Sequence, residues 1–280
     1  MIERADVVEL VQRALAEDLG AAGDVTTLAT IPATMIGAAD LVVRADGVVA
    51  GIDVARYVFE TVSQGRLRTE LGTADGARVE AGEVLATTRG PLRDILTAER
   101  TALNLLGHLS GIATLTRKWV DAVEGTGAQI RDTRKTMPGL RALEKYAVRM
   151  GGGMNHRMSL SDAALIKDNH VAAAGGVVAA FEAVRRSYPE LDLEVEVDTL
   201  AQAREVIDAG ADLVLLDNMT PADMKAAVAF SGRRARLEAS GGLRLDNARQ
   251  VAETGVDYLS VGALTHSAPV LDIGLDIRTA

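Results

Sequence analysis

The chain contains no cysteine, and this absence removes several classes of chemistry. None of its 280 residues can form a disulfide, act as a thiolate nucleophile or build a zinc–thiolate centre. Aromatic residues make up only 3% of the sequence, so the core must be built from Ala, Val, Leu and Ile. Such a core is typical of α/β proteins with buried parallel strands. The length allows one large domain or two smaller ones.

The sequence also lacks a long apolar run. No segment approaches the roughly 20 uninterrupted apolar residues that a membrane-spanning helix requires. Residues 1–20 form an amphipathic pattern that contains acidic residues, without the basic start and apolar run of a signal peptide. We therefore expect no membrane association and a cytoplasmic location. A reducing cytoplasm also suits a chain without cysteine.

The charge is acidic overall but unevenly distributed. A net charge of −9 argues against a nucleic-acid partner. Residues 131–169 carry +4, which leaves −13 on the rest of the chain. A basic island in an acidic protein predicts a small anionic ligand. Three of its cations, Arg141, Lys145 and Arg149, have helical spacing, and we interpret them as part of a solvated helix face.

Residues 1–110 mix helical and strand-like patterns, which favours an α+β domain. The helical patterns cover 3–17, 53–62 and 96–123, and the strand-like patterns cover 40–51 and 74–91. The longest helical pattern contains Gly107 and Gly111. Because glycine weakens a helix interior, we expect this helix to be interrupted there.

The second half of the chain repeats a different unit, in which a short apolar run ends in polar residues and a helical pattern often follows. The runs are 128–133, 163–169, 193–199, 211–218, 236–242 and 257–263. This alternation predicts parallel strands joined by right-handed crossovers. Six such units favour a closed or nearly closed α/β barrel over an open doubly wound sheet. No GxGxxG motif follows the first run, which weakens a dinucleotide-binding interpretation.

Polar residues recur where the predicted strands end. In an α/β barrel these ends and the loops after them build the active site. The residues are Thr133, Arg134 and Lys135; Lys167, Asp168 and Asn169; Glu196 and Asp198; Asp217 and Asn218; Ser240, Gly241 and Gly242; and Gly262 and Ala263, with His266 close behind. A single such residue is more often a helix N-cap, and residues 198–199 and 218–220 fit that interpretation. Six strand ends together are harder to explain by capping alone.

The last two strand ends predict a phosphate site. The segments EASGGL and SVGAL place small residues where backbone N–H groups can approach a ligand closely. The Ser240 hydroxyl could add a hydrogen bond. The alternative is that Gly241 and Gly242 serve only a tight turn.

Charges of both signs accompany this predicted phosphate site. The cations are Arg134, Lys135, Arg157 and Lys167, and the acids are Glu196 and Asp217. Carboxylates accept hydrogen bonds from a ribose diol and can hold Mg²⁺ together with a pyrophosphate. Arginine binds planar carboxylates with two parallel hydrogen bonds. The set therefore predicts a phosphorylated sugar and a multiply anionic acceptor as ligands.

Segments along nearly the whole chain resemble the quinolinate phosphoribosyltransferase (decarboxylating) family in order and spacing. The most specific is TRKTMPGLRALEKYAVRMGGGMNHRMSLSDAALIKDNH, residues 133–170. The others are residues 17–27, 99–114, 193–199, 215–218, 238–243 and 257–267.

This resemblance implies a fold and a reaction. The fold is an N-terminal α/β sandwich domain over residues 1–110, on which the tail 268–280 packs, and an incomplete, about seven-stranded α/β barrel over 111–267. The reaction is phosphoribosyl transfer from 5-phosphoribosyl 1-pyrophosphate to quinolinate with decarboxylation. It gives nicotinate mononucleotide, CO₂ and pyrophosphate in de novo NAD biosynthesis. The resemblance also implies Mg²⁺ with the pyrophosphate, no organic cofactor, and a homodimer or dimer-based hexamer.

The resemblance further implies a role for individual residues. Arg134, His156 and Arg157 are expected to bind quinolinate, Thr133 to contact substrate, and Arg100 to complete the site of a partner subunit. Lys135, Lys167, Glu196 and Asp217 are the expected catalytic residues. Of these, the lysines lie between the substrates, and the acids bind ribose and hold Mg²⁺ indirectly through pyrophosphate and water. The expected 5-phosphate cradle consists of Ser240, Gly241, Gly242, Val261, Gly262 and Ala263, with His266 nearby.

Three alternatives remain open at this point. The chain could be a related phosphoribosyltransferase that uses another acceptor, such as nicotinate. It could also be a paralogue of uncertain substrate that is associated with molybdate transport. Lys167 at a strand end could form a Schiff base in a lyase. A non-catalytic barrel could serve as a binding protein. Two arginines and a histidine suit two carboxylates better than one, which favours quinolinate as the acceptor.

Overall fold

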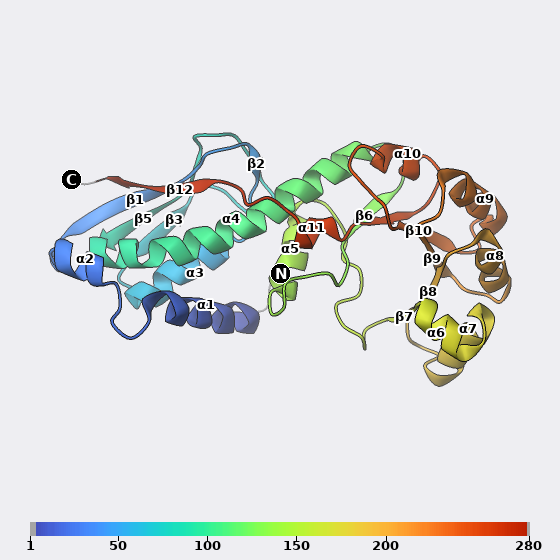
Figure 1. The fold of residues 1–280 in the computed structure, drawn as a ribbon. Helices are drawn as coiled ribbons and strands as arrows, with labels where there is room; N and C mark the ends of the chain where they lie inside the picture. Colours follow the sequence, from blue (N-terminus) through green and yellow to red (C-terminus); the bar gives the residue numbers. More distant parts are fainter. Residues whose placement is uncertain (1–3, 279–280) are drawn as a thin grey trace. The chain divides into compact units, whose positions relative to one another are not determined.

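The computed structural model describes residues 4–278 (Figure 1). The chain divides into two units, which are described separately. The first consists of residues 1–117, 137–152 and 265–280, and the second of residues 118–136 and 153–264. Among the described residues, no helix is long and apolar enough to cross a membrane.

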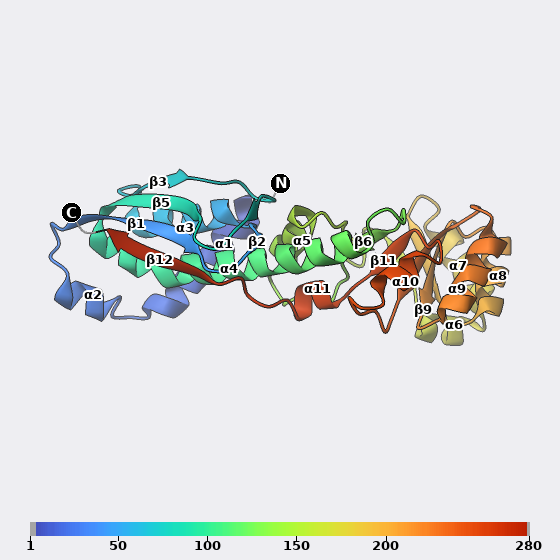
Figure 2. The same cartoon turned by 90° about the horizontal axis from the view of Figure 1, so that it is seen from above.

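The first unit is built on a four-stranded antiparallel sheet in the order β12-β1-β5-β3. Its strands are β1 (Ile36–Val43), β3 (Arg68–Leu71), β5 (Val84–Pro91) and β12 (Ile273–Arg278). The last strand of the chain pairs with the first, in a register that runs from Val43 opposite Ile273 to Ala38 opposite Arg278 (Figure 2). Two short strands, β2 (Gly47–Val48) and β4 (Arg78–Val79), form a separate antiparallel pair.

The helices of the first unit are α1 (Arg4–Leu19), α2 (Val25–Thr30), α3 (Ile52–Ser63) and α5 (Arg141–Met150), with most of α4 (Leu92–Ala122) and the end of α11 (Ala263–His266). The predicted helix over 53–62 is confirmed, and so is the predicted helix over 3–17 from residue 4 onward, residue 3 lying outside the described residues. Both α3 and α4 run beside the sheet (Figures 1 and 2). Helix α3 buries Val54, Val58 and Phe59, spaced for one apolar face.

Helix α4 is continuous, so the predicted interruption at its glycines is wrong. A Cβ atom on Gly107 would lie 2.9 Å from the carbonyl oxygen of Leu271, and one on Gly111 would lie 2.1 Å from that of Pro269. The Leu271 N–H also donates to the Gly107 carbonyl at 3.0 Å. These glycines therefore let residues 269–271 approach the helix backbone and do not end the helix.

Helix α5 also departs from expectation. Lys145 is fully buried, so the prediction of a solvated face is wrong for this residue, while Arg141 and Arg149 are half-buried. Leu143, Ala147 and Val148 are buried on the same short helix. Helical spacing places cations on one stripe, but packing decides whether that stripe faces water.

The second unit contains six parallel strands in the order β6-β11-β10-β9-β8-β7. They are β6 (Gln129–Arg131), β7 (Ala164–Ile166), β8 (Leu193–Val197), β9 (Leu213–Asp217), β10 (Arg236–Ser240) and β11 (Tyr258–Ser260). The connecting helices are α6 (Asp168–Ala174), α7 (Val177–Ser187), α8 (Leu200–Asp208), α9 (Pro221–Ser231) and α10 (Ala248–Ala252). All six predicted strands are confirmed.

The strand order is that of a ring that remains open. β6, the first strand in the sequence, pairs with β11, the last, so β6 and β7 form the two edges of the sheet. An isolated parallel bridge between Arg131 and Met154 adds one more segment beside β6. The predicted incomplete barrel of about seven strands is therefore present as six strands and one bridge.

Strand β8 gives one face of this sheet a charged character, because glutamates alternate with apolar residues along it. On β8, Leu193, Val195 and Val197 alternate with Glu194 and Glu196. Successive side chains of a strand point to opposite faces, so both glutamates point the same way. Two buried charged layers thus follow from one short strand.

Candidate active site at the carboxyl ends of the barrel strands

The carboxyl ends of β7 and β8 bring two predicted site residues together. Lys167 directly follows β7, and Glu196 is the penultimate residue of β8. The Lys167 ammonium forms an ion pair with the Glu196 carboxylate. The lysine side chain is half exposed and the glutamate side chain is largely buried. A positive and a negative group therefore lie side by side at the mouth of the barrel.

Asp217 ends β9 and lies next to a glycine turn at the end of β10. The Asn218 side chain donates to Asp217 Oδ2 at 2.7 Å. A Cβ atom on Gly241 would lie only 2.2 Å from Asn218 Oδ1, and Gly241 has a φ of +81°. Both observations require glycine at 241. The turn and the aspartate are thus fixed to one another through Asn218.

The same turn presents backbone donors. The N–H groups of Gly241 and Gly242 donate to no other group in the part of the chain that the structure describes. Ser240, the last residue of β10, is half-buried beside them. In contrast, the Val261 N–H is already engaged, since it donates to the Arg131 carbonyl at 2.9 Å. Residues 240–242 therefore supply the clearer anion site of the two predicted segments.

The loop after β6 carries Thr133, Arg134 and Lys135. It folds into a tight turn in which the Lys135 N–H donates to Thr133 Oγ1 at 3.0 Å. Lys135 is exposed and Arg134 is half-buried. The Arg134 Nε atom is buried without a hydrogen-bond partner among the described residues. A buried unpaired donor is costly, so it indicates an acceptor that binds there.

Arg157 provides a second half-buried cation close to Arg134. Burial, and then the nearby positive charge of Arg134, lower the pKa of the Arg157 guanidinium. One of its terminal nitrogens donates to the Ala163 carbonyl at 3.0 Å. Two arginines held near one another in a partly buried place favour an anion with more than one negative group.

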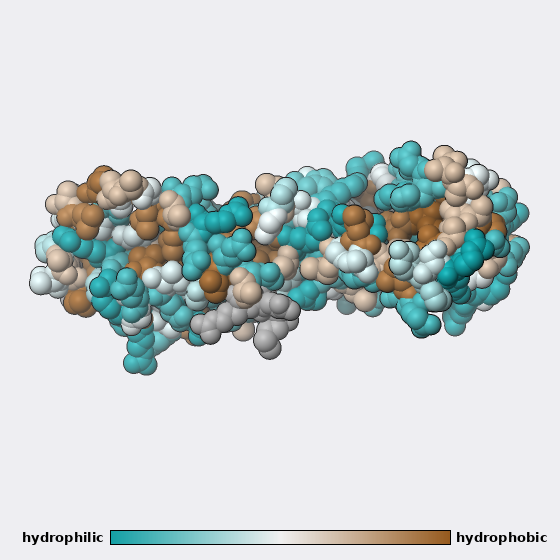
Figure 3. Space-filling view, turned by 90° about the horizontal axis from the view of Figure 1, so that it is seen from below, coloured by the Kyte–Doolittle hydropathy of each residue, from teal (hydrophilic) through white to brown (hydrophobic). Residues whose placement is uncertain are grey.

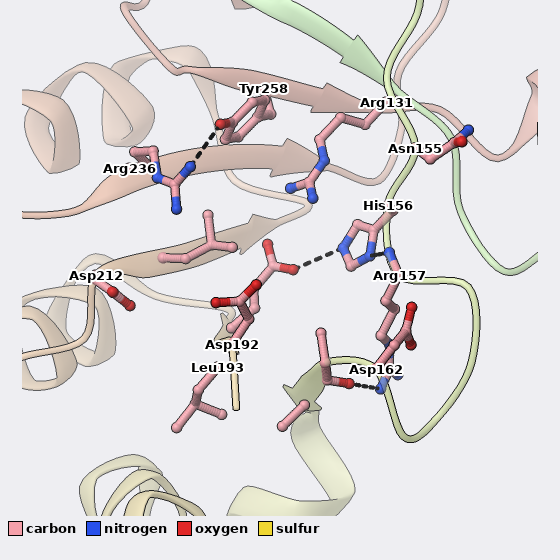
Figure 4. Close-up of a pocket in the computed structure, with 14 residues that line it drawn as sticks. Arg131, Asn155, His156, Arg157, Asp162, Asp192, Leu193, Asp212, Arg236 and Tyr258 are labelled. Carbon is pink, nitrogen blue, oxygen red and sulfur yellow. Dashed lines mark hydrogen bonds and ion pairs between the residues drawn. The ribbon is translucent and has the colours of Figure 1, made fainter. Parts of the chain in front are cut away.

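His156 lies next to Arg157, and both of its ring nitrogens have partners (Figure 4). Nδ1 accepts the Arg157 backbone N–H at 2.7 Å. Nε2 lies 2.7 Å from a Glu194 oxygen and 3.5 Å from a Glu238 oxygen. The His156 N–H donates to Asp132 at 2.8 Å. The imidazole is therefore buried and fixed from several sides.

The sequence analysis missed Arg131, Glu194 and Glu238, which form the polar floor of the barrel. Arg131 pairs with Glu238, and the Ser260 hydroxyl donates to the same carboxylate. Burial raises the pKa of Glu194 to about 7. Burial, followed by the charge of Glu194, raises the pKa of Glu238.

A sequence signal for these two glutamates was present. In residues 193–197 and 236–240, period-two alternation places Glu194 on the face of Glu196, and Glu238 on the face of Ser240. Reading each strand for its inward face, rather than only for its end, would have found both.

A cavity of about 320 Å³ opens at the other end of the strands (Figure 4). Its lining includes Leu193, Leu213 and Arg236, which begin β8, β9 and β10, together with the predicted site residues His156 and Arg157. None of Lys167, Glu196 and Asp217 lines it. The cavity therefore belongs to the amino ends of the strands and not to the predicted catalytic mouth.

Two groups of residues could hold a metal ion. Ligand atoms of His156, Glu194 and Glu238 lie within 4.8 Å of one another, but Arg131 already pairs with Glu238. Glu196 and Asp217 offer oxygen donors at the carboxyl ends of β8 and β9. Oxygen ligands suit Mg²⁺ held together with a phosphate, so the second group fits that ion better.

The remaining predicted residues belong to the first unit, or serve as caps. Arg100 is exposed on α4, and the exposed His266 ends α11 with its Nδ1 atom 2.7 Å from the Ser267 hydroxyl. Thr199 and Thr220 accept hydrogen bonds from the first turns of α8 and α9. The capping interpretation is thus confirmed for these two threonines.

The fold and the site define an α/β-barrel protein that gathers a lysine–carboxylate pair and open backbone donors at the carboxyl ends of its strands, with Arg134 in the loop after β6 and Arg157 close to it. Models of the quinolinate phosphoribosyl transferase N-terminal and C-terminal domains match residues 24–110 and 112–276. The chain belongs to the quinolinate phosphoribosyltransferase family.

Individual relatives agree with this assignment. The chain is 54% identical to a nicotinate-nucleotide pyrophosphorylase (carboxylating) of Mycobacterium leprae, over 96% of each chain. It is 41% identical to a quinolinate phosphoribosyltransferase (decarboxylating) of Nicotiana glauca, over 98% of this chain and 83% of the relative. The solved nicotinate-nucleotide pyrophosphorylase of Francisella tularensis superposes with a TM-score of 0.95 at 37% identity, covering 99% of this chain and 98% of the other.

Proposed function

We propose that the chain transfers a phosphoribosyl group from 5-phosphoribosyl 1-pyrophosphate to quinolinate with decarboxylation, as a step of de novo NAD biosynthesis. The observation that carries this proposal is the pair Arg134 and Arg157 held close together, with a buried unpaired donor on Arg134. Family membership supports it, and so do the acids and lysines around the same mouth.

The two arginines account for the acceptor. Quinolinate carries two adjacent carboxylates, and each guanidinium can bind one with paired hydrogen bonds. Nicotinate carries a single carboxylate and would leave one buried guanidinium without an anion, which is costly. Quinolinate is therefore the better acceptor, and nicotinate remains the second candidate.

The phosphorylated sugar fits the carboxyl ends of β8, β9 and β10. The open N–H groups of Gly241 and Gly242, with the Ser240 hydroxyl, suit the 5-phosphate. Glu196 and Asp217 can accept hydrogen bonds from the ribose hydroxyls. They are also the residues that would hold Mg²⁺ indirectly, and this ion supplies charge neutralisation to the pyrophosphate when bound.

The chemistry follows from these placements. The arginines hold the pyridine nitrogen toward C1 of the sugar, so the reacting atoms meet in a fixed orientation. As the C1–O bond breaks, the sugar gains positive charge that Glu196 and Asp217 stabilise, and Lys135 and Lys167 stabilise the departing pyrophosphate. The new C1–N bond makes the ring nitrogen cationic. The C2 carboxylate then leaves as CO₂, the ring keeps the electron pair, and a proton takes the place of the carboxylate.

We further propose a homodimer in which Arg100 of one copy reaches the quinolinate site of the other. Arg100 is exposed on α4. Val25, Leu28 and Ile36 are exposed apolar residues of α2 and the start of β1, and Figure 3 shows apolar side chains among polar ones at the end of the view where α2 lies. A chain without cysteine suits the cytoplasm, which we infer as its compartment.

Direct assay of the purified protein tests the acceptor. Quinolinate, 5-phosphoribosyl 1-pyrophosphate and Mg²⁺ are expected to give nicotinate mononucleotide, CO₂ and pyrophosphate in equal amounts, and nicotinate in place of quinolinate is expected to give little product. Turnover with nicotinate only would overturn the acceptor, and turnover with neither would overturn the transferase. Borohydride trapping of Lys167 with a carbonyl substrate would instead favour the lyase.

A further inference from the structure

The buried imidazole of His156 uses both ring nitrogens within the chain. Nδ1 accepts the Arg157 N–H at 2.7 Å, so this nitrogen carries no proton. The proton of the neutral ring then resides on Nε2, which faces Glu194 at 2.7 Å. The ring therefore connects the inner face of β8 to the backbone at Arg157.

Glu194 is the carboxylate that depends on this contact. It is 3% exposed, and the charges of Arg131 and Arg157 and a contact with Glu238 act on it as well. His156 Nε2 lies 2.7 Å from one of its oxygens and joins the carboxylate to the ring. Glu238, in contrast, is held by Arg131 and Ser260 and lies farther from the ring.

Two hydrogen bonds hold Arg157, one at its backbone and one at its side chain. Its backbone N–H is fixed by the imidazole, and its guanidinium donates to the Ala163 carbonyl at 3.0 Å. A shift of the imidazole would shift the start of this side chain. Glu194 and Arg157 do not need to touch for this coupling, because the ring spans the distance between them.

We propose that Glu194 is a positioning residue that acts through His156: it holds the imidazole with its proton on Nε2, and the ring in turn fixes Arg157 for binding of the acceptor carboxylate. The role of Arg157 rests on the proposed function.

Isosteric substitutions separate this role from direct binding by His156. The side-chain oxygen of His156→Asn takes the place of Nδ1 and can still accept the Arg157 N–H, whereas His156→Gln places its amide near Nε2. His156→Asn loses the contact with Glu194, and His156→Gln loses the contact with the Arg157 N–H. We expect both variants, and Glu194→Ala, to raise the quinolinate KM about tenfold, the effect of losing one buried polar contact. Glu194→Gln retains an acceptor for Nε2–H and is expected to restore the wild-type KM.

Controls distinguish positioning from general damage. The KM for 5-phosphoribosyl 1-pyrophosphate and the thermal unfolding midpoint are expected to change little in Glu194→Gln and His156→Asn. A selective loss in His156→Asn with activity kept in His156→Gln would show that Nε2 binds quinolinate directly and would overturn the proposal. An unchanged quinolinate KM in Glu194→Ala would also overturn it.

A measurement on the resting protein keeps this test separate from the proposed function. Nitrogen-15 NMR of labelled histidine, with His156 assigned by the His156→Asn spectrum, is expected to show an unprotonated Nδ1 and a protonated Nε2. Glu194→Ala is expected to shift both signals. The opposite tautomer would overturn the positioning role even if quinolinate is turned over. Conversely, the expected tautomer in a protein that fails to use quinolinate would overturn only the function.

Discussion

Two arginine side chains, Arg134 and Arg157, have polar groups whose environment favours a bound anion. Arg134 buries its Nε atom without a partner among the described residues, beside a second guanidinium whose pKa is lowered. Each feature disfavours the protein without ligand, and an anion bound between the two arginines would relieve both. Binding of the proposed acceptor would therefore relieve an unfavourable arrangement of the two arginines.

Replacing Arg134 tests this interpretation. We expect Arg134→Ala to raise the quinolinate KM by about 30- to 100-fold, because a charge-assisted pair of hydrogen bonds is lost. The change is measured by steady-state kinetics at saturating 5-phosphoribosyl 1-pyrophosphate. Arg186→Ala, on the exposed surface of α7, is the matched control and is expected to leave both constants unchanged. Equal kinetics in the two variants would remove Arg134 from the site.

Glu194 gives the protein a pH-dependent element of stability. Burial raises its pKa from 4.5 to about 7, so between these values the folded protein binds a proton that the unfolded chain has released. The contribution of Glu194 to stability is therefore present in full below pH 4.5 and is lost as the pH rises through 7.

The comparison of wild type with Glu194→Gln isolates this contribution. The free energy of unfolding of the wild type, relative to that of Glu194→Gln, is expected to fall between pH 4.5 and 7 and to become flat above it. Urea denaturation at a series of pH values measures both proteins. A difference that stays constant across this range would contradict the raised pKa.

Among the elements, helix α4 shows how packing can override local preference. Glycine disfavours a helix interior by about 1 kcal/mol relative to alanine, and two glycines one turn apart predicted a break. The helix continues because the segment 269–271 occupies the space that two side chains would fill. The C-terminal segment therefore stabilises the helix whose sequence argues against it.

The space at Gly111 can be probed directly. Gly111→Ala is expected to lower the free energy of unfolding by about 2 kcal/mol or more, since its Cβ atom would meet the Pro269 oxygen at 2.1 Å. Thermal and urea denaturation measure the change. Asn104→Ala, at an exposed position of the same helix, is expected to leave stability unchanged or slightly higher. A stabilised Gly111→Ala variant would show that the segment does not pack there.

At the scale of the whole molecule, each sheet pairs strands that are far apart in the sequence. β12 completes the first sheet beside β1, and β6 completes the second beside β11. Each sheet therefore requires segments that are far apart in the sequence. The proposed homodimer extends this principle to a second copy, because Arg100 would complete a site that its own chain does not finish.

Mixing two inactive variants tests that shared site. Arg100→Ala and Arg134→Ala are each expected to be nearly inactive as homodimers at low quinolinate concentration. Random exchange makes half of the dimers mixed, and each of these has one intact site, so about a quarter of the wild-type activity is expected to return. Analytical ultracentrifugation verifies that the species are dimers. No recovery after verified exchange would place Arg100 and Arg134 in the site of the same subunit.

The sequence by itself determined the local elements and the positions of polar groups along them. The six strands of the second unit, and the placement of Lys167, Glu196 and Asp217 at their ends, follow from periodicity within a few residues. Thr199 and Thr220 were predictable as caps for the same reason. These features are set by residues that are adjacent in the sequence, so the sequence is enough to predict them.

Only the tertiary structure decided which distant groups meet. It buried Lys145, kept α4 continuous, and joined Glu194 to Arg157 through His156. Each outcome depends on contacts between segments tens of residues apart, and burial changes the energy of a charge or a glycine far more than local preference does. Sequence periodicity predicts which face of a helix or strand a residue occupies. Only tertiary packing determines whether that face contacts solvent or another segment of the chain.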